Sequence, residues 1–174
     1  MNETIKNLVE RRSVRKFKKE QVKEEQLQEI LMAGTFAPTA VGLQCPVIVV
    51  TQDAKTIAQL SHLNAEVMGT NTDPFYGAPT IITVLADHSI NQTTCVEDGS
   101  LVLGNIMNAA FSLGVDSCWI HRAKEVFETE EGKQLLAQWG LDGDYIGIGY
   151  CILGYRDCEL PKAKARKKNY VIRT

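Results

Sequence analysis

The sequence feature that most limits the possible folds is an apolar segment at residues 98–113. Its apolar side chains fall on nearly every side of the helix that the segment predicts: Leu101, Val102, Leu103, Ile106, Met107, Ala110 and Phe111. A helix that is hydrophobic all round is generally buried all round. A stripe of small or polar residues recurs at intervals of four and permits close approach of another helix: Ser100, Gly104, Asn108 and Ser112. We therefore expect a central helix, packed either within a monomer or against a second copy in a symmetric dimer.

Segments rich in apolar and β-branched residues, such as Val47-Ile48-Val49-Val50, predict buried strands. We expect strands at residues 47–50, 80–86, 116–122 and 145–154, and helices at residues 3–10, 23–34, 54–68 and 131–139 beside the apolar one. Their alternation predicts an α/β layered domain with helices on both faces of the sheet. Gly147 and Gly149 are expected on one face of the last strand, with another part of the chain pressing against it. Residues 69–77 are polar and turn-rich, which predicts a mobile loop or lid.

Length and composition indicate one globular domain, residues 1–174. The chain is 44% hydrophobic and 23% charged, with a net charge of −2 that argues against a general nucleic-acid binder. No apolar stretch reaches the ~20 residues of a membrane helix. The cysteines are odd in number and form no Cys-x-x-Cys pair, and no signal peptide is recognisable, so we expect reduced thiols in the cytoplasm. The histidines are too isolated for a metal site.

Basic residues gather at the two ends of the chain. Arg11, Arg12 and Arg15 surround Ser13, and a second cluster contains Lys164 and Arg166. Guanidinium groups and a hydroxyl suit phosphate oxygens, so the two clusters predict a seat for one phosphorylated ligand if they converge. The alternative is that both are solvated surface runs, the first at the end of a helix where cations favour the dipole.

Two further segments have a functional and a structural interpretation. The loop at residues 37–46 is built of small residues and lets a ligand approach the backbone closely, or it is an ordinary helix-to-strand connection. His121 follows a predicted strand and is either an acid or base or, as is more common for a lone histidine, structural. Gly147 and Gly149 form no dinucleotide fingerprint, because the third glycine and a following helix are missing.

In their order and spacing, these motifs are similar to those of the nitroreductase family of FMN-dependent oxidoreductases, over essentially the whole chain. The resemblance rests on Arg11-Arg12-Ser13-Val14-Arg15-Lys16-Phe17, on Ala37-Pro38-Thr39-Ala40 followed by Gln44 and Pro46, on the apolar helix, on Leu113-Gly114-Val115-Asp116-Ser117-Cys118-Trp119-Ile120, and on Lys164-Ala165-Arg166. Many relatives carry Asn in place of Gly42 and Trp in place of Pro46. These departures concern the substrate pocket more than FMN binding.

The resemblance implies a mixed α/β sheet flanked by helices, in a homodimer whose exchanged terminal segments embrace the partner and whose two FMN sites lie at the interface. The resemblance also implies which residues bind FMN. Those toward the phosphate and ribityl chain are Arg11, Arg12, Ser13, Arg15, Lys164 and Arg166. Those near the ring are Pro38, Thr39, Ala40 and Gln44 of the partner subunit, Trp119, Ile120, His121 and Arg122 beside the ring, and Asn64 at its pyrimidine edge.

The implied activity is reduction of nitroaromatic, quinone or similar small acceptors by NAD(P)H in a ping-pong mechanism, with no dedicated catalytic side chain. One alternative is a flavin-binding module without turnover, a carrier or sensor. Another is a small nucleic-acid binder with basic ends. The sequence leaves open the physiological acceptor, the choice between NADH and NADPH, and the roles of Cys118 and His121.

Overall fold

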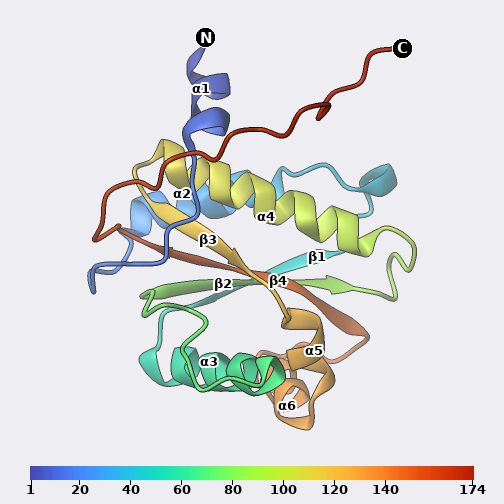
Figure 1. The fold of residues 1–174 in the computed structure, drawn as a ribbon. Coiled ribbons are helices and arrows are strands. Elements are labelled where there is room, and N and C mark those ends of the chain that lie inside the picture. Colours follow the sequence, from blue (N-terminus) through green and yellow to red (C-terminus); the bar gives the residue numbers. More distant parts are fainter.

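A four-stranded sheet lies between two layers of helices in the computed structural model, which describes all 174 residues (Figure 1). The strands are β1 (Pro46–Thr51), β2 (Thr80–Asp87), β3 (Asp116–Ile120) and β4 (Tyr145–Gly154), in the spatial order β1-β2-β4-β3. All three pairings among them are antiparallel. The one parallel pairing is an isolated bridge between Ser13 and Ser117, so the sheet is mixed only through that bridge.

The helices cover both faces of the sheet, as predicted. One layer contains α2 (Glu24–Thr35) and α4 (Cys95–Ser112), and the other contains α3 (Ala54–Met68), α5 (Ala123–Glu128) and α6 (Glu130–Gln138). Helix α1 (Glu3–Glu10) and the C-terminal tail extend from the α4 side, and a short 3-10 helix, η1 (Ala40–Gly42), follows α2. Strand β4 and helices α1 and α3 have the predicted bounds. Helix α5 was not predicted, because it is too short to show a helical period.

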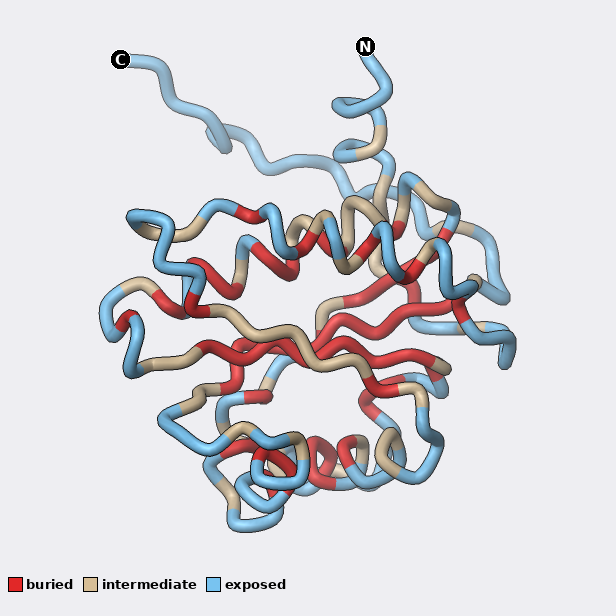
Figure 2. Tube along the Cα trace, turned by 180° about the vertical axis from the view of Figure 1, so that it is seen from behind, coloured by how far each residue is buried: buried red, intermediate tan, exposed pale blue.

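Two hydrophobic clusters, one on each face of the sheet, form the core, and Figure 2 shows how burial concentrates in the strands and in the helix sides that face them. Residues of β2 are buried on both faces, which explains its unbroken apolar sequence. Each helix layer therefore completes one half of the core, as a layered domain requires.

The two glycines of β4 face opposite sides of the sheet, and the prediction that they share a face is wrong. The register between β2 and β4 shifts between Val84 and Leu85, because Ile148 is an extra residue on β4. A β-bulge of this kind breaks the alternation of side chains. A Cβ atom on Gly147 would lie 2.3 Å from the backbone of Ala123 in α5, whereas one on Gly149 would lie 2.7 Å from the indole nitrogen of Trp119.

Helix α4 is buried on one side only, so the expectation of burial all round is wrong for the single chain. Leu103 and Ile106 are fully buried, but Leu101 is 48% exposed and Val96 is 53% exposed. A Cβ atom on Gly104, in the stripe of small residues, would meet open space. The helix therefore presents a partly apolar outer side. Every helix in the chain is too short or too polar to span a membrane.

Candidate functional site

The N-terminal basic segment is anchored to the body of the protein. Val14 is fully buried, and its backbone N–H donates a 3.0 Å hydrogen bond to the carbonyl of Ser117 in β3. Four residues later, the N–H of Lys18 donates to the carbonyl of Tyr155 at 2.8 Å. The side chains of Arg11 and Arg15 therefore leave a backbone that the fold holds in place.

The charges of this segment are largely uncompensated. Arg11, Arg12 and Arg15 form no ion pair with a carboxylate, and one terminal nitrogen of Arg11 is buried without a hydrogen-bond partner. Arg15 lies over the ring of Tyr76, 5.8 Å from its centroid. Buried guanidinium nitrogens are normally paired. The free donors of Arg11 and Arg15, beside the half-buried hydroxyl residue Ser13, therefore fit a phosphate group.

Arg12 differs from its neighbours. One of its terminal nitrogens donates to the carbonyls of Val9 at 2.6 Å and Arg11 at 2.8 Å, which caps the end of α1. This is the helix-end role that the sequence left open as an alternative, and it places the Arg12 side chain on the backbone. Its remaining Nε is buried and unpartnered.

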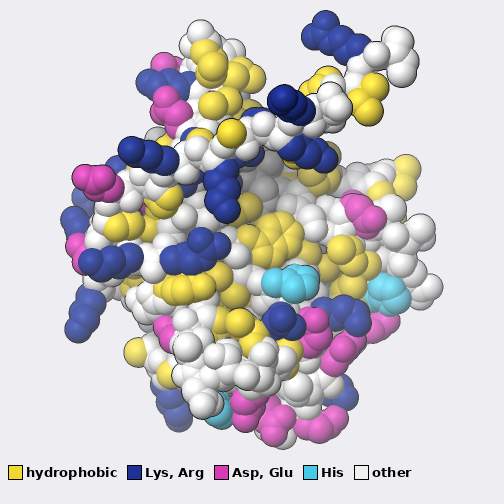
Figure 3. Space-filling view, viewed as in Figure 1, with side chains coloured by type: hydrophobic (Ala, Val, Ile, Leu, Met, Phe, Trp, Pro, Cys, Tyr) yellow, Lys and Arg dark blue, Asp and Glu magenta, His cyan; other side chains and the backbone are white.

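The second basic cluster lies in a tail that makes no hydrogen bond to the body beyond Asp157. Lys164 and Arg166 are exposed, and the Arg166 guanidinium reaches only the carbonyl of Lys164, at 2.8 Å. The tail and α1 extend from the same side of the molecule (Figure 1), and basic side chains run along the tail and across the upper and left parts of that surface (Figure 3). The single chain does not join the two clusters by hydrogen bonds, so their convergence stays a prediction.

The anchored segment pairs with β3 at Ser117, and the predicted ring-side residues follow at the end of that strand. Trp119 is half-buried and packs across Gly149, and Ile120 is buried in the core, so only its backbone is available to a ligand. His121 is exposed and makes no side-chain hydrogen bond, which excludes the structural role of a buried histidine. Arg122 has a left-handed backbone, with φ of 77°.

Asn64, predicted to lie at the pyrimidine edge of the ring, is buried in the single chain. Its side chain, on α3, is fully buried, and its amide nitrogen donates a 3.0 Å hydrogen bond to the carbonyl of His121. A side chain without exposed surface cannot contact the edge of a bound ring in this conformation. Asn64 instead supports the turn that joins β3 to α5.

The loop predicted to reach a ring is strained and exposed. Pro38 is exposed, Thr39 and Ala40 are half-buried, and Gln44, like Val41, has a positive φ. The φ values are 53° for Gln44 and 48° for Val41, whose side chain is 97% exposed. Such conformations cost of the order of 1–3 kcal/mol each and persist only where the surroundings hold them. No hydrogen bond joins this loop to the basic segment within one chain.

Asp98, which the sequence analysis did not identify as a site residue, holds this loop. Its carboxylate is 97% buried in the first turn of α4 and accepts hydrogen bonds from the backbone N–H of Ala40 at 3.0 Å and the amide of Asn91 at 3.1 Å. The thiol of Cys45 lies 3.5 Å from the same carboxylate. Burial, reinforced by Asp98, raises the pKa of Cys45 to about 11, so this thiol stays protonated. An acidic residue in the first turn of a helix was the only signal in the sequence.

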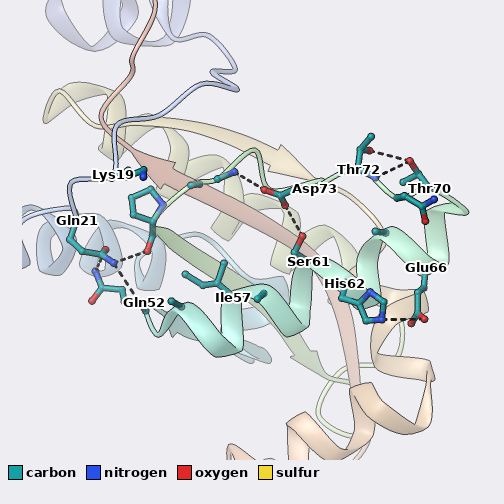
Figure 4. A pocket seen from close by; sticks show the side chains of 17 residues that line it. Lys19, Gln21, Gln52, Ile57, Ser61, His62, Glu66, Thr70, Thr72 and Asp73 are labelled. Atoms are coloured by element: carbon teal, nitrogen blue, oxygen red, sulfur yellow. Dashed lines mark hydrogen bonds and ion pairs between the residues drawn. The ribbon is translucent and has the colours of Figure 1, made fainter.

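A cavity lies away from these residues. It measures about 780 Å³ and runs between α3 and the loop at residues 69–79, with Gln21 and Gln52 at one end and His62 at the other (Figure 4). A smaller cavity of about 280 Å³ borders Thr39 and Gln44. None of the predicted FMN-binding residues lines the larger cavity.

The loop beside the larger cavity, predicted to be a mobile loop or lid, makes hydrogen bonds and packing contacts with the body. Asp73 accepts hydrogen bonds from the Ser61 hydroxyl at 2.6 Å and from the backbone N–H of Gly77 at 2.7 Å. Phe75 is buried and packs edge-on against Tyr150. Tyr76 reaches out toward Arg15. The loop therefore has one face on the cavity and one on the anchored basic segment.

Comparison with known proteins agrees with the fold. The model of the nitroreductase family matches residues 8–155. A nitroreductase from Bacteroides fragilis, solved with bound FMN, superposes with a TM-score of 0.91 at 23% identity and covers 100% of both chains. An FMN-dependent nitroreductase from Clostridium difficile superposes with a TM-score of 0.87 at 26% identity over 99% of each chain.

A relative found by sequence is an FMN reductase [NAD(P)H] from Bacillus subtilis. It is 30% identical over 130 residues, which cover 66% of this chain and 52% of that protein. The family match extends from α1 to the end of β4 and includes the anchored basic segment, the strained loop and the end of β3. The chain therefore belongs to the nitroreductase family.

Proposed function

We propose that this protein is an FMN-dependent oxidoreductase that uses NAD(P)H to reduce nitroaromatic, quinone or similar small acceptors in a ping-pong mechanism. The observation that carries the proposal is the anchored basic segment, in which the charges of Arg11 and Arg15 have no carboxylate partner. Uncompensated guanidinium groups on a fixed backbone suit the dianionic phosphate of FMN.

Within this proposal, Arg11, Ser13 and Arg15 hold the phosphate from one side, and Lys164 and Arg166 hold it from the other. The tail carrying the latter two is exposed throughout, so it is free to fold over a bound phosphate. The two basic ends thus serve one anion, which explains their presence in a chain with a net charge of −2.

We further propose that the active form is a homodimer. Apolar residues are exposed along one side of the molecule: Ile5, Leu8 and Val9 on α1, Val96 and Leu101 on α4, and Tyr170, Val171 and Ile172 in the tail. Exposed apolar residues gathered on one side of a molecule are typical of an interaction surface. In the dimer, the loop at residues 38–44 of each subunit would reach the ring in its partner's site. The tails would embrace the partner, as in the exchange that the family resemblance implies.

FMN, when bound, supplies the redox chemistry by accepting a hydride from the nicotinamide and passing electrons to the acceptor. The chain's own residues bind the phosphate, orient the ring beside residues 119–122 and shape the pocket with the strained loop. No side chain is required as an acid if water supplies protons, and the exposed His121 is left without an assigned proton-transfer role. All five cysteines are free, which is the state expected in the cytoplasm, where we place the protein.

An absorbance spectrum of the purified protein, followed by anaerobic titration with NADH and NADPH, tests the proposal. We expect bound FMN at one per subunit and bleaching of its visible absorbance by at least one of the nicotinamides. Bound FMN that never bleaches would instead indicate a carrier or sensor without turnover. A preparation that binds no added FMN, or binds nucleic acid at low salt, would contradict the proposal outright.

A further inference from the structure

The turn between β3 and α5 is strained. β3 ends at Ile120 and α5 begins at Ala123, so only His121 and Arg122 connect them. Arg122 has φ of 77° and ψ of 14°, a left-handed conformation that costs a non-glycine residue about 1–2 kcal/mol, and no side chain caps α5. Contacts from elsewhere must therefore hold the turn in this shape.

Two contacts do so, from two different elements. The amide nitrogen of Asn64, on α3, donates a 3.0 Å hydrogen bond to the carbonyl of His121. On the other side, the backbone of Ala123 lies close against Gly147 of β4. A Cβ atom on Gly147 would lie only 2.3 Å from the backbone carbonyl of Ala123. The first contact fixes the start of the turn and the second fixes its end.

Asn64 also belongs to a buried polar group. The carbonyl oxygen of its side chain, the Tyr150 hydroxyl and one carboxylate oxygen of Glu125 are buried and have no hydrogen-bond partner of standard geometry. Burial raises the pKa of Tyr150, the nearby Glu125 carboxylate raises it further, and Asn64 opposes the rise. Tyr150 is therefore a neutral O–H donor in the physiological range.

The chemistry of these neighbours sets the orientation of the Asn64 amide. The carbonyl of His121 can only accept, so it requires the amide nitrogen, whereas the Tyr150 hydroxyl can donate to the amide oxygen. A fully buried amide with a fixed acceptor on one side and a donor on the other has one favourable orientation. The amide nitrogen therefore faces the turn, where its one formed hydrogen bond links α3 to the carbonyl of His121.

We propose that Asn64 is a positioning residue of the flavin site, which acts through its hydrogen bond to the His121 carbonyl and not by touching the ring. The inference rests on the proposed function, in which residues 119–122 pass beside the ring. Without the amide, nothing from α3 holds the carbonyl of His121, and Arg122 is free to leave its left-handed conformation. The exposed His121 and the half-buried Arg122 would then lose their fixed positions next to the ring.

The test compares Asn64→Leu with a matched control, Asn105→Leu. Asn105 makes the same kind of bond, from its amide nitrogen to the carbonyl of Ala33 at 3.0 Å, but it links α4 to α2 on the opposite face of the sheet. Amide hydrogen exchange is measured first, in the flavin-free protein. We expect at least 10-fold faster exchange at residues 120–126 in Asn64→Leu and unchanged exchange there in Asn105→Leu.

FMN affinity is measured next on the same variants. We expect the dissociation constant of FMN to rise about 5- to 10-fold in Asn64→Leu, as for the loss of one hydrogen bond that orders the site. Tyr150→Phe, which removes only the orienting hydroxyl, should show the same changes to a smaller extent. It keeps the inference testable if Asn64→Leu does not fold.

The outcomes separate this inference from the proposed function. The inference would be overturned if exchange at residues 120–126 were as slow as in the wild type in both Asn64→Leu and Tyr150→Phe. It would also be overturned if exchange became faster while FMN affinity stayed unchanged, because Asn64 would then support only the fold. A wild-type protein whose bound FMN is not bleached by nicotinamide would refute the proposed turnover, while the exchange and affinity measurements would still decide the role of Asn64.

Discussion

The N-terminal basic segment at residues 11–19 lies against β3 and the end of β4, whereas the C-terminal basic segment at residues 162–168 is exposed along its whole length. The first has a buried Val14 and backbone hydrogen bonds to Ser117 and Tyr155. The second has only a local contact between Arg166 and Lys164. One half of the proposed phosphate site is therefore built into the fold, and the other half must be ordered by the ligand or by a second subunit.

This difference has an energetic consequence. Ligand contacts from a preformed segment cost little ordering entropy, whereas contacts from a free segment are reduced by the cost of fixing it. The anchored half should therefore receive the phosphate first, and the free half should close over it and control how long FMN stays. The following changes test that division of roles.

Removal of residues 162–174 should have the largest effect. The truncated chain lacks both Lys164 and Arg166, and the loss of two charge-assisted contacts predicts an FMN dissociation constant at least roughly 100-fold higher. The thermal unfolding of the flavin-free subunit should be little changed, because the tail makes no hydrogen bonds to the body. Flavin fluorescence titration measures the first quantity and circular dichroism the second. Tight FMN binding by the truncated chain would show that the anchored segment suffices.

Thiol reactivity should distinguish the exposed tail from the buried body. Cys158, at the start of the tail, is exposed, whereas Cys45 is buried and its pKa is raised from 9.0 to about 11. A rise of two units lowers the thiolate fraction about 100-fold below pH 9. We expect iodoacetamide at pH 8 to modify one cysteine rapidly, and the rapid phase to vanish in Cys158→Ser.

The same shift has a defined sign for stability. Folding favours the protonated thiol of Cys45, so its stabilising contribution is complete below pH 9 and is lost as the pH rises through 11.

Slow modification of Cys158 in the holoprotein, but rapid modification in the flavin-free form, would sharpen the comparison by showing that the ligand orders the tail.

Single arginine changes should give smaller but distinguishable effects. Arg11→Ala and Arg166→Ala each remove one charge-assisted contact, which predicts FMN binding weaker by about 10- to 100-fold. Because Arg11 belongs to the anchored half, its loss should slow association as well, whereas loss of Arg166 should act mainly on dissociation. Arg173→Ala, a neighbouring exposed residue outside the predicted site, is the control. Equal rate changes in the two variants would break the comparison.

The sequence predicted the framework of the fold well, because its strands and longer helices carry strong periodic signals. The predictions failed where packing against other parts of the chain determines the structure. The bulge at Ile148, which turns Gly147 and Gly149 to opposite faces, depends on the pairing with β2 and leaves no trace in a single strand's pattern. The partial exposure of α4 likewise depends on what covers it, which a hydrophobic pattern does not state.

For the candidate site, the sequence identified segments better than it identified roles. The basic segment and the loop at residues 37–46 were located from their composition, and the family was recognised from their order. The positions of Asn64 and Asp98 could not be predicted, since each acts through a bond to a residue more than 50 positions away. Their roles come from the way α3 and α4 are packed, not from any local motif.

The smallest expected effect concerns Arg156, which lies where the anchored and free parts of the chain meet. It pairs in an isolated bridge with Phe17, and one of its guanidinium nitrogens donates to both carboxylate oxygens of Asp116 at 3.1 Å. The Asp116 side chain is 1% exposed and that of Arg156 is 42% exposed. Arg156→Ala would leave a buried carboxylate unpaired, but water can reach it where the arginine was. We therefore expect a loss of about 1–2 kcal/mol in the free energy of unfolding, below the range for fully buried pairs.

The control for Arg156→Ala is Lys16→Ala, which removes the ion pair between Lys16 and Asp157 at 3.5 Å. Both side chains of that pair are more than half exposed, so urea denaturation should detect almost no change in stability. If the Asp116 pair fixes the basic segment, Arg156→Ala should also weaken FMN binding, although Arg156 is outside the predicted site. Equal stability of the two variants would mean that the backbone bonds at Val14 and Lys18 alone anchor the segment. The preformed half of the phosphate site would then depend on strand-like pairing with β3 and not on charge.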